Sequence, residues 1–499
     1  MARIAVIGAG MGAMAAAARL AVAGHHVVVH ERASTYGGAV GSTARDGFLF
    51  DTGPVLLHLP AVYRDLFVKT GKEPLERCVE LAQVEPASHH VFADGREVSL
   101  PNASRAGVGD ALDAALGAGT GARWSAYMNR AREAWDRTRR PLLEEPLWPN
   151  WEVLAEREPY PSVPVRRLLR RERRATTLAE AGELELGDPR LVALLESHAL
   201  AAGLDPRTAP ASAAVLPYME QTFGAWSVRG GMRELARAVY ERCLARRVTF
   251  TFGSEVTRIV TKDGRAAGIE LSDGSVEDAD SVVAGVPPEV LARLTDEPGP
   301  WPEGGVPART RLPSRLTVLL ALRGARPEAT PHRTVLHTRD RAAELDALFG
   351  TAVPGAVGEA TLTVVRPGDH ARVPDAEHEA VTLTATVAHG AEVTSAEVDR
   401  LVERAGAVVE GLRERLLWRE VRTPAEVEAA TGAVGGGVPA PALAGAGGRL
   451  LHPSNSTGLP GLYAVGGWSH PGGGLPHAGM SGSLVAGLIV EGPAFTGSR

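Results

Sequence analysis

The sequence has little of several residue types, and each shortage excludes a class of protein. Only two of its 499 residues are cysteines, Cys78 and Cys243, and they lie far apart. This excludes a disulfide scaffold, a zinc ribbon and a dithiol redox relay, and it is typical of a reducing cytoplasm. Aromatic residues make up 5% of the chain, which argues against a surface on which nucleic-acid bases stack.

The chain also lacks a strong net charge and a long apolar run. Its formal net charge of −6 provides no basic field to attract nucleic acid or acidic substrates. The opening MARIAVIGAG contains no signal-peptide core, and no apolar run approaches the ~20 residues that cross a bilayer. The histidines are scattered and predict no metal site. We expect a cytoplasmic protein of about two domains, since this length exceeds what one core usually supports.

Two similar glycine motifs stand out, GAGMGA at residues 8–13 and GAGTGA at residues 117–122. The first follows a β-branched run, RIAVI, which predicts a buried strand, and it precedes an alanine-rich stretch that predicts a helix. VVVH at residues 27–30 then predicts a second strand. The second motif lies between two stretches with helical character, so we predict that it only links helices.

The first motif has the parts of a dinucleotide-binding βαβ unit. Gly8 suits the tight turn, Gly10 lets the backbone approach a pyrophosphate, and Ala13 permits close packing of helix on strand. The helix N-terminus suits the phosphates. Glu31 ends the second strand, where it can accept hydrogen bonds from the adenosine ribose.

Two segments favour FAD over NAD, although NAD would also suit the βαβ unit. Residues 31–54 place Gly37 and Gly38 after the second strand, and their hairpin-like DGFLFDTGP returns to Gly53 and Pro54, where a flat ring can lie. After VRGGM, a helix and a β-hairpin with Asp-Gly turns are predicted. Val256 in that hairpin is placed to offer backbone to the adenine edge.

A third segment, residues 461–491, also favours FAD. It reads as a strand ending in Gly466 and Gly467, a glycine-rich loop, and a helix beginning near Met480 and Ser481. We expect that helix N-terminus to direct its positive dipole at the flavin N1–C2=O edge.

GFLFDTGP, RGGM and GLYAVGGWSHPGGGLP carry a family resemblance, because they occur in the family's order. The chain resembles the carotenoid (phytoene) desaturase family within the FAD-dependent amine-oxidase-like superfamily, over about the first 65 residues, residues 220–290 and the last 50. This implies an α/β fold with a discontinuous Rossmann-type FAD-binding domain and an inserted α+β substrate-binding domain. The FAD-binding domain comprises residues 1–100, 222–295 and 450–499, and the substrate-binding domain residues 101–221 and 296–449.

The resemblance also implies a reaction and a set of cofactor-binding residues. A hydride passes from a C–H bond of an apolar, polyene or isoprenoid substrate to flavin N5, a C=C bond forms, and an external acceptor such as oxygen or a quinone reoxidises the flavin. The cofactor-binding candidates are Gly8, Gly10, Met11, Gly12, Ala13, Glu31, Arg32, Gly37, Gly38, Gly53, Pro54, Val256, Gly466, Gly467, Gly479, Met480 and Ser481.

One departure keeps other functions open. The family usually has arginine after its glycine pair, whereas Ala39 and Val40 follow Gly38, and Arg45 cannot be assumed to substitute. A flavin oxidase, dehydrogenase or isomerase acting on an amine or another small secondary metabolite remains an alternative. A non-catalytic flavin-binding protein is a third hypothesis.

The substrate side offers few candidates for chemistry. His470 is a candidate acid or base because histidine titrates near neutral pH, although its SHPGGG motif also suits a structural role. Weaker candidates for the catalytic or substrate-facing surface are His58, Tyr218, Glu220, Trp468 and His477.

The basic run at residues 163–174 is predicted to be a surface helix that carries Arg166, Arg170 and Arg174 on one face. It could make peripheral contact with an anionic membrane. Charge runs are more often solvated faces, and nearby acids such as Glu180 favour that interpretation.

Overall fold

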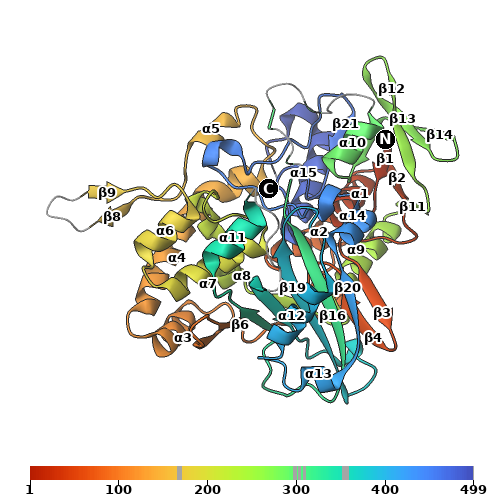
Figure 1. Ribbon diagram of the computed structural model, residues 1–499. Helices are drawn as coiled ribbons and strands as arrows, with labels where there is room; N and C mark the ends of the chain where they lie inside the picture. Colours follow the sequence, from red (N-terminus) through yellow and green to blue (C-terminus); the bar gives the residue numbers. More distant parts are fainter. Residues whose placement is uncertain are drawn as a thin grey trace.

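The computed structural model describes residues 1–165, 171–295, 301, 305–306, 309, 311–350 and 359–497. Two β-sheets and a layer of helices make up most of the chain, and Figure 1 shows the helices on one side of the larger sheet. This mixed architecture confirms the predicted α/β class.

A five-stranded parallel sheet joins the N-terminal strand to a strand from the last part of the chain. Its order is β11–β2–β1–β15–β21, and the strands are β1 (Arg3–Ile7), β2 (His26–Glu31), β11 (Thr249–Phe252), β15 (Ser281–Ala284) and β21 (Leu462–Ala464). Four of the five β1 residues are buried, as expected of a strand covered on both faces. Three distant stretches of sequence therefore build one sheet.

Helices α1 (Met11–Val22) and α15 (Leu475–Glu491) pack closely beside this sheet. A Cβ on Gly482 would lie 2.5 Å from the Gly12 carbonyl oxygen, so the two backbones approach to a distance that only glycine allows. The first and last glycine motifs therefore meet in space, as the sequence predicts.

Two hairpins extend from this region. Strands β3 (Ser42–Arg45) and β4 (Phe48–Asp51) form the predicted DGFLFD hairpin. Strands β12 (Val256–Lys262), β13 (Arg265–Leu271) and β14 (Val276–Asp278) form an antiparallel meander that turns at Asp263–Gly264. Both residues of that turn have positive φ, as an Asp-Gly hairpin requires.

A seven-stranded sheet forms the second layer. It is antiparallel except between β17 and β6, and its strands in order are β20 (Leu416–Arg422), β16 (Ser314–Arg323), β19 (His378–Val387), β18 (Leu362–Val365), β17 (Arg333–Leu336), β6 (Ser88–Val91) and β7 (Glu97–Leu100). β16 and β19 pair along their whole length, from Ser314 opposite Val387 to Arg323 opposite His378. β6 and β7 belong here, although the sequence assigns residues 88–100 to the flavin-binding part; a hairpin's local pattern does not reveal its partner sheet.

The helical layer covers the region between the two sheets. It comprises α3 (Arg105–Leu116), α4 (Thr120–Arg139), a π-helical turn (Arg140–Glu144), α5 (Glu152–Glu156), α6 (Leu178–Glu185), α7 (Pro189–Ala201) and α8 (Val215–Phe223). Its apolar core also includes Met480 of α15. The GAGTGA motif joins α3 to α4, so its predicted role as a linker is confirmed.

The remaining elements connect and cover these layers. They are α2 (Ala61–Gly71), α9 (Arg233–Ala245), α10 (Pro288–Leu294), α11 (Arg341–Phe349), α12 (Ser395–Ala405), α13 (Leu412–Arg415), α14 (Pro424–Thr431), β5 (Leu81–Gln83) and β10 (Trp226–Val228). α12 begins with a capping box at Thr394 and packs on one face of the seven-stranded sheet, whose other face contacts the β3–β4 hairpin.

The predicted surface helix at residues 163–174 is wrong. Val163–Val165 (β8) pairs antiparallel with Arg171–Arg173 (β9) in a projecting arm, seen in Figure 1. Arg166 and Arg170 lie outside the described residues. β-Branched Val163 and Val165 favour strand, and regular spacing of arginines alone does not specify a helix.

Candidate active site

The first glycine turn leaves backbone donors free beside an open space. Gly8 has φ +88°, which a side chain would strain, and its N–H donates to the His30 carbonyl 2.8 Å away. Gly10 begins α1, and among the described residues no side chain caps this helix and no acidic residue stands in its first turn. A Cβ on Gly10 would meet no atom within 4 Å. The first N–H groups of α1, including those of Met11 and Gly12, therefore border space that suits an anion.

Glu31 lies against this turn. Its Oε2 accepts a hydrogen bond from Ala9 N at 2.7 Å, and its Oε1 accepts one from Ala33 N at 2.8 Å. The carboxylate is thereby fixed beside the glycine motif, as the sequence predicts. Arg32 instead donates to the Ala429 carbonyl at 2.9 Å, so its side chain is directed to α14.

The adjoining Val256 strand also begins near Glu31. Ser254 N donates to the Glu31 carbonyl at 2.9 Å, and Val256 itself is buried at the start of β12. This places the Val256 backbone near the same end of the parallel sheet as Glu31.

The Gly37–Gly38 turn packs directly on the first glycine motif. Gly37 N donates to the Ala9 carbonyl at 2.8 Å, and a Cβ on Gly38 would lie 3.1 Å from Gly10 Cα. Arg233 of the RGGM segment supports this turn by donating to the Tyr36 and Val40 carbonyl oxygens and by lying 4.1 Å from the Tyr36 ring centroid.

Arg233 is a residue that the sequence analysis missed. Its position directly after RGGM is the feature of the sequence that could have identified it. Arg45, by contrast, contacts the Trp418 ring and Asp46, away from the turn. Gly53 passes close to the same turn, since its Cβ would lie 1.9 Å from the Ala39 carbonyl oxygen, and Pro54 after it is half-buried.

The C-terminal glycine turn completes this surface. Gly466 follows β21 with φ +99°, a Cβ there would meet no atom within 4 Å, and its N–H donates to Ser481 Oγ at 2.9 Å. Asn455 Nδ2 donates to the His470 carbonyl at 2.7 Å and to Ser481 Oγ at 3.0 Å, which fixes the loop to α15. A Cβ on Gly467 would lie 3.0 Å from Pro439 Cγ.

The predicted start of the last helix is wrong. α15 begins at Leu475 rather than near Met480, because proline at position 476 is tolerated in a first helical turn. Ser481 and Met480 therefore lie in the second turn. A Cβ on Gly479 would lie 2.8 Å from Val62, so this glycine serves helix packing.

His470 and His477 are both buried and uncharged. Burial lowers the pKa of His470 to about 4, although its contact with the Glu145 carbonyl opposes the shift. The pKa of His477 is also lowered to about 4, mainly by burial and to a smaller extent by electrostatic interaction with His470. His470 Nε2 donates to the Glu145 carbonyl at 3.0 Å. This favours a packing role for His470 over the acid–base role considered from sequence. Trp468 is half-buried in the same loop.

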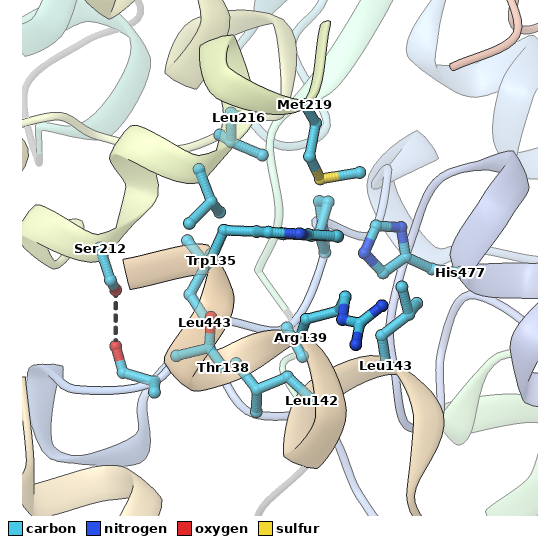
Figure 2. A pocket seen from close by; sticks show the side chains of 14 residues that line it. Trp135, Thr138, Arg139, Leu142, Leu143, Ser212, Leu216, Met219, Leu443 and His477 are labelled. Atoms are coloured by element: carbon cyan, nitrogen blue, oxygen red, sulfur yellow. Dashed lines mark hydrogen bonds between the residues drawn. The ribbon is translucent and has the colours of Figure 1, made fainter. Parts of the chain in front are cut away.

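A narrow apolar cavity reaches the first turn of α15. It has a volume of about 20 Å³, and Figure 2 shows Trp135, Met219 and His477 around it. Leucines from the turn after α4, from α8 and from the loop at residues 441–444 also line it, together with the polar residues Thr138, Arg139 and Ser212. Tyr218 lies in the adjoining helical core, with its ring centroid 6.4 Å from that of Trp135.

His58 and Glu220, two substrate-side candidates, lie close together. His58 Nε2 is 3.8 Å from Glu220 Oε2, and Arg333 of β17 binds both oxygens of that carboxylate. Burial alone would raise the pKa of Glu220, but the charge of Arg333 and contacts with histidine hold it well below its usual value. Glu220 is therefore a permanent anion.

Comparison with known proteins identifies the family. The model of the family described as flavin containing amine oxidoreductase matches residues 14–490. The chain belongs to this family. It is accordingly an FAD-dependent oxidoreductase. The glycine surface built by residues 8–13, 37–38 and 466–467 fits the FAD cofactor, because backbone N–H groups at the start of α1 are free and Gly10 has no side chain to fill the space beside them.

Several characterised proteins resemble this oxidoreductase along almost their whole length. A 4,4'-diapolycopene oxygenase of Methylomonas sp is 29% identical over 506 residues, covering 98% of each chain. A hydroxyneurosporene desaturase of Rubrivivax gelatinosus is 28% identical over 497 residues, covering 98% of this chain and 93% of the relative.

Solved structures of low identity share the fold. An oxidoreductase from Methanosarcina mazei has a TM-score of 0.64 at 17% identity, covering 97% of this chain and 99% of that one. Putrescine oxidase bound to putrescine has a TM-score of 0.63 at 13% identity, covering 98% and 99%.

The described residues also bear on membrane spanning and on metal binding. No helix in the described ranges has the length and apolar character that would span a bilayer. Nor does this part of the chain bring together three or more histidine, cysteine, aspartate or glutamate side chains in a way that could hold a metal ion.

Proposed function

We propose that this flavoenzyme dehydrogenates a carbon–carbon bond of an apolar isoprenoid or polyene substrate. The observation that carries the proposal is the position of the apolar cavity, which reaches His477 in the first turn of α15, the helix that packs on the FAD glycine motif. The names of the diapolycopene and hydroxyneurosporene relatives, both full-length matches, support the same substrate class.

The residues of this chain divide the work of holding cofactor and substrate. The N–H groups at the start of α1 would bind the FAD pyrophosphate, Glu31 the adenosine ribose, and Val256 the adenine. FAD, when bound, accepts a hydride at N5. Trp135 and Met219 would present apolar surface to the substrate, and the space beside them, about 20 Å³, has to widen by side-chain movement to hold an isoprenoid chain.

Neither nearby histidine is placed to donate a proton as an imidazolium. Both have a pKa of about 4, so they are uncharged at neutral pH. Dehydrogenation also releases a proton from the substrate, and a histidine with a pKa of about 4 is too weak a base to hold that proton at neutral pH.

The electron acceptor and the substrate must both come from outside this chain. We propose that oxygen or a quinone reoxidises the reduced flavin, and that the cytoplasmic enzyme collects its poorly soluble substrate at a membrane surface. Among the described side chains of the projecting β8–β9 arm and the residue after it, Arg173 and Arg174 are basic and exposed, and we propose that they make that contact. Flotation with anionic and neutral vesicles, compared between the natural protein and an R173E/R174E variant, tests the contact.

Anaerobic mixing tests the proposed reaction. The FAD-loaded enzyme is mixed with phytoene, with hydroxyneurosporene and, as the competing class, with putrescine, while the absorbance of oxidised flavin is followed. We expect bleaching by an isoprenoid, with formation of a product having one more double bond. Bleaching by the amine alone would contradict the proposal, and a bound flavin that no substrate bleaches would favour a non-catalytic role.

A further inference from the structure

A second pocket lies between the loop that joins α7 to α8 and the segment that leads into β16. Its volume is about 250 Å³, more than ten times that of the apolar cavity. Arg309 and Arg311 line it, together with Asp205, Phe349 and Leu450 among others. We call it the arginine pocket. None of its described lining residues belongs to the glycine turns that form the FAD surface.

Arg309 carries a charge that nothing in the described part of the chain balances. The residue is half-buried, and its Nη1 atom is shielded from solvent without a hydrogen-bond partner among the described residues. Burial lowers the pKa of Arg309, and no described carboxylate opposes that shift. Removing an unpaired guanidinium from water costs free energy. A bound anion is the ligand that would offset this cost.

Arg311 adds a second cation to the arginine pocket. It is exposed, and its guanidinium has no ion pair or hydrogen bond with the described residues. The acid of the pocket, Asp205, is already taken by Arg207, whose Nε donates to Oδ1 at 3.0 Å and whose Nη2 donates to Oδ2 at 2.9 Å. Asp205 therefore does not neutralise Arg309 or Arg311.

Ion pairs fix the walls of the arginine pocket. Arg341 of α11 binds Glu196 of α7, and Arg207 Nη1 donates to Asp346 of α11 at 2.5 Å. These pairs hold α11, which ends at Phe349, against α7 and the loop that follows it. The pocket is therefore formed by contacts within the fold, so a ligand would bind without the cost of ordering its walls.

The arginine pocket adjoins the apolar cavity without being part of it. Leu450 lines the arginine pocket and Leu443 lines the apolar cavity, and Leu443 N donates to the Leu450 carbonyl at 3.1 Å. Arg309 is also close enough to His452 for its charge to contribute to lowering the pKa of that histidine to about 3. His452 Nε2 in turn donates to the Ala440 carbonyl at 2.8 Å. The two hollows therefore lie on either side of the paired segments 440–443 and 450–452.

We propose that the arginine pocket is a second ligand site, which binds the phosphate group of a small phosphate ester or of a phospholipid. Guanidinium groups match phosphate oxygens in paired hydrogen bonds, and a phosphate dianion balances the two unpaired cations of Arg309 and Arg311. Phe349 and Leu450 provide apolar surface for the organic part of the ligand. This site does not depend on which substrate the flavin oxidises.

Calorimetric titration of the FAD-loaded enzyme with inorganic phosphate, at constant ionic strength, tests the site. We expect saturable binding of one phosphate per chain and a rise in the unfolding temperature with phosphate concentration, whereas acetate should bind at least about tenfold more weakly. Arg309→Gln should weaken phosphate binding about tenfold or more, and the exposed Arg311→Gln about 3- to 10-fold.

Two comparisons separate loss of binding from loss of folding. Arg309→Gln removes an unpaired, half-buried charge, so without phosphate this variant should keep its FAD and unfold at the same temperature as the natural protein or at a higher one. Arg400→Gln, on the exposed side of α12, removes the same charge outside the arginine pocket and should leave phosphate binding unchanged.

Flotation with phosphatidylcholine vesicles, with and without phosphatidic acid, distinguishes the two sources of phosphate. Binding to the phosphatidic acid vesicles that is lost in R309Q/R311Q but kept in R173E/R174E assigns the site to a phospholipid. Binding of inorganic phosphate without such vesicle binding assigns it to a small phosphate ester. The proposal is overturned if the natural enzyme binds neither probe, or if R309Q/R311Q binds both as well as the natural enzyme does. Either of these results would leave the proposed dehydrogenation standing, because flavin bleaching tests that reaction separately.

Discussion

Replacing Gly10 by valine is the sharpest test of the cofactor site, because the structure separates its effect on folding from its effect on binding. Gly10 has φ −73° and ψ 167°, an extended conformation that valine adopts readily. A Cβ there would meet no protein atom within 4 Å. The protein should therefore fold normally while the valine side chain occupies the space beside the first N–H groups of α1.

The expected loss of FAD affinity follows from those N–H groups. A hydrogen bond to a charged group contributes about 1.5–3 kcal/mol, and displacing the pyrophosphate from two of them costs about 3–6 kcal/mol. At 1.4 kcal/mol per factor of ten, FAD should bind about 10²- to 10⁴-fold more weakly. The purified Gly10→Val protein should be colourless, with unchanged circular dichroism.

Gly119→Val is the matched control for this experiment. Gly119 has φ +89° in the α3–α4 linker, so valine there should destabilise the fold by about 1–2 kcal/mol while leaving the FAD content at one per chain. Flavin absorbance relative to protein, together with thermal unfolding, reports both effects. Retention of stoichiometric FAD by Gly10→Val would refute the assignment of the first glycine motif.

Three further predictions address the surroundings of the site. Arg233→Met should weaken FAD binding about tenfold or more in a fluorescence titration, because the Gly37–Val40 turn loses a charged donor, and Arg233→Lys should restore part of the affinity. His470 and His477 each have a pKa of about 4 in the folded protein and 6.5 in the unfolded chain, so unfolding takes up protons below pH 6.5. The free energy of unfolding measured in urea should therefore fall from pH 6.5 toward pH 4, by at most about 3 kcal/mol per histidine. The pH dependence expected from Glu158 has the opposite direction. Burial raises the pKa of Glu158 to about 7, so its ionisation in the folded protein lowers the free energy of unfolding as pH rises from 4.5 through 7. Glu158→Gln should therefore stabilise the protein more at pH 8 than at pH 5.

The parts of the fold that were predictable from sequence have local signals. The βαβ unit around Gly10 and the Asp-Gly hairpin can each be recognised within one continuous stretch of at most about thirty residues, through periodicity or turn chemistry. The prediction failed where partners are distant in sequence. β6 pairs with β17, which lies about half the length of the chain away in sequence, and nothing in the four residues of β6 specifies that sheet.

The candidate site shows the same division. Glu31 lies against the first glycine motif because both belong to one supersecondary unit, so their proximity could be predicted from sequence alone. The relation of His58 to Glu220 and Arg333 depends on a loop, a helix and a strand from three regions, so only the tertiary structure reveals it. The start of α15 was predicted too late in the sequence, because Pro476 and the glycines before it are residues typical of loops. Only the packing of α15 against α1 shows that the helix begins at Leu475.

The departure at Ala39 and Val40 has a structural consequence for how the cofactor turn is held. A turn that has no arginine after its glycine pair still needs hydrogen-bond donors for its carbonyl oxygens, because a buried backbone acceptor without a hydrogen bond costs free energy. Arg233 supplies this support, from a segment almost two hundred residues further along the chain, by donating to the Val40 carbonyl. The segment carrying Arg233 is in turn fixed by Asp51, which accepts from Met232 N at 2.8 Å. Asp51 also pairs with Arg372 at 3.0 Å, so one buried carboxylate joins the segment before β19 to the segment that supports the Gly37–Val40 turn.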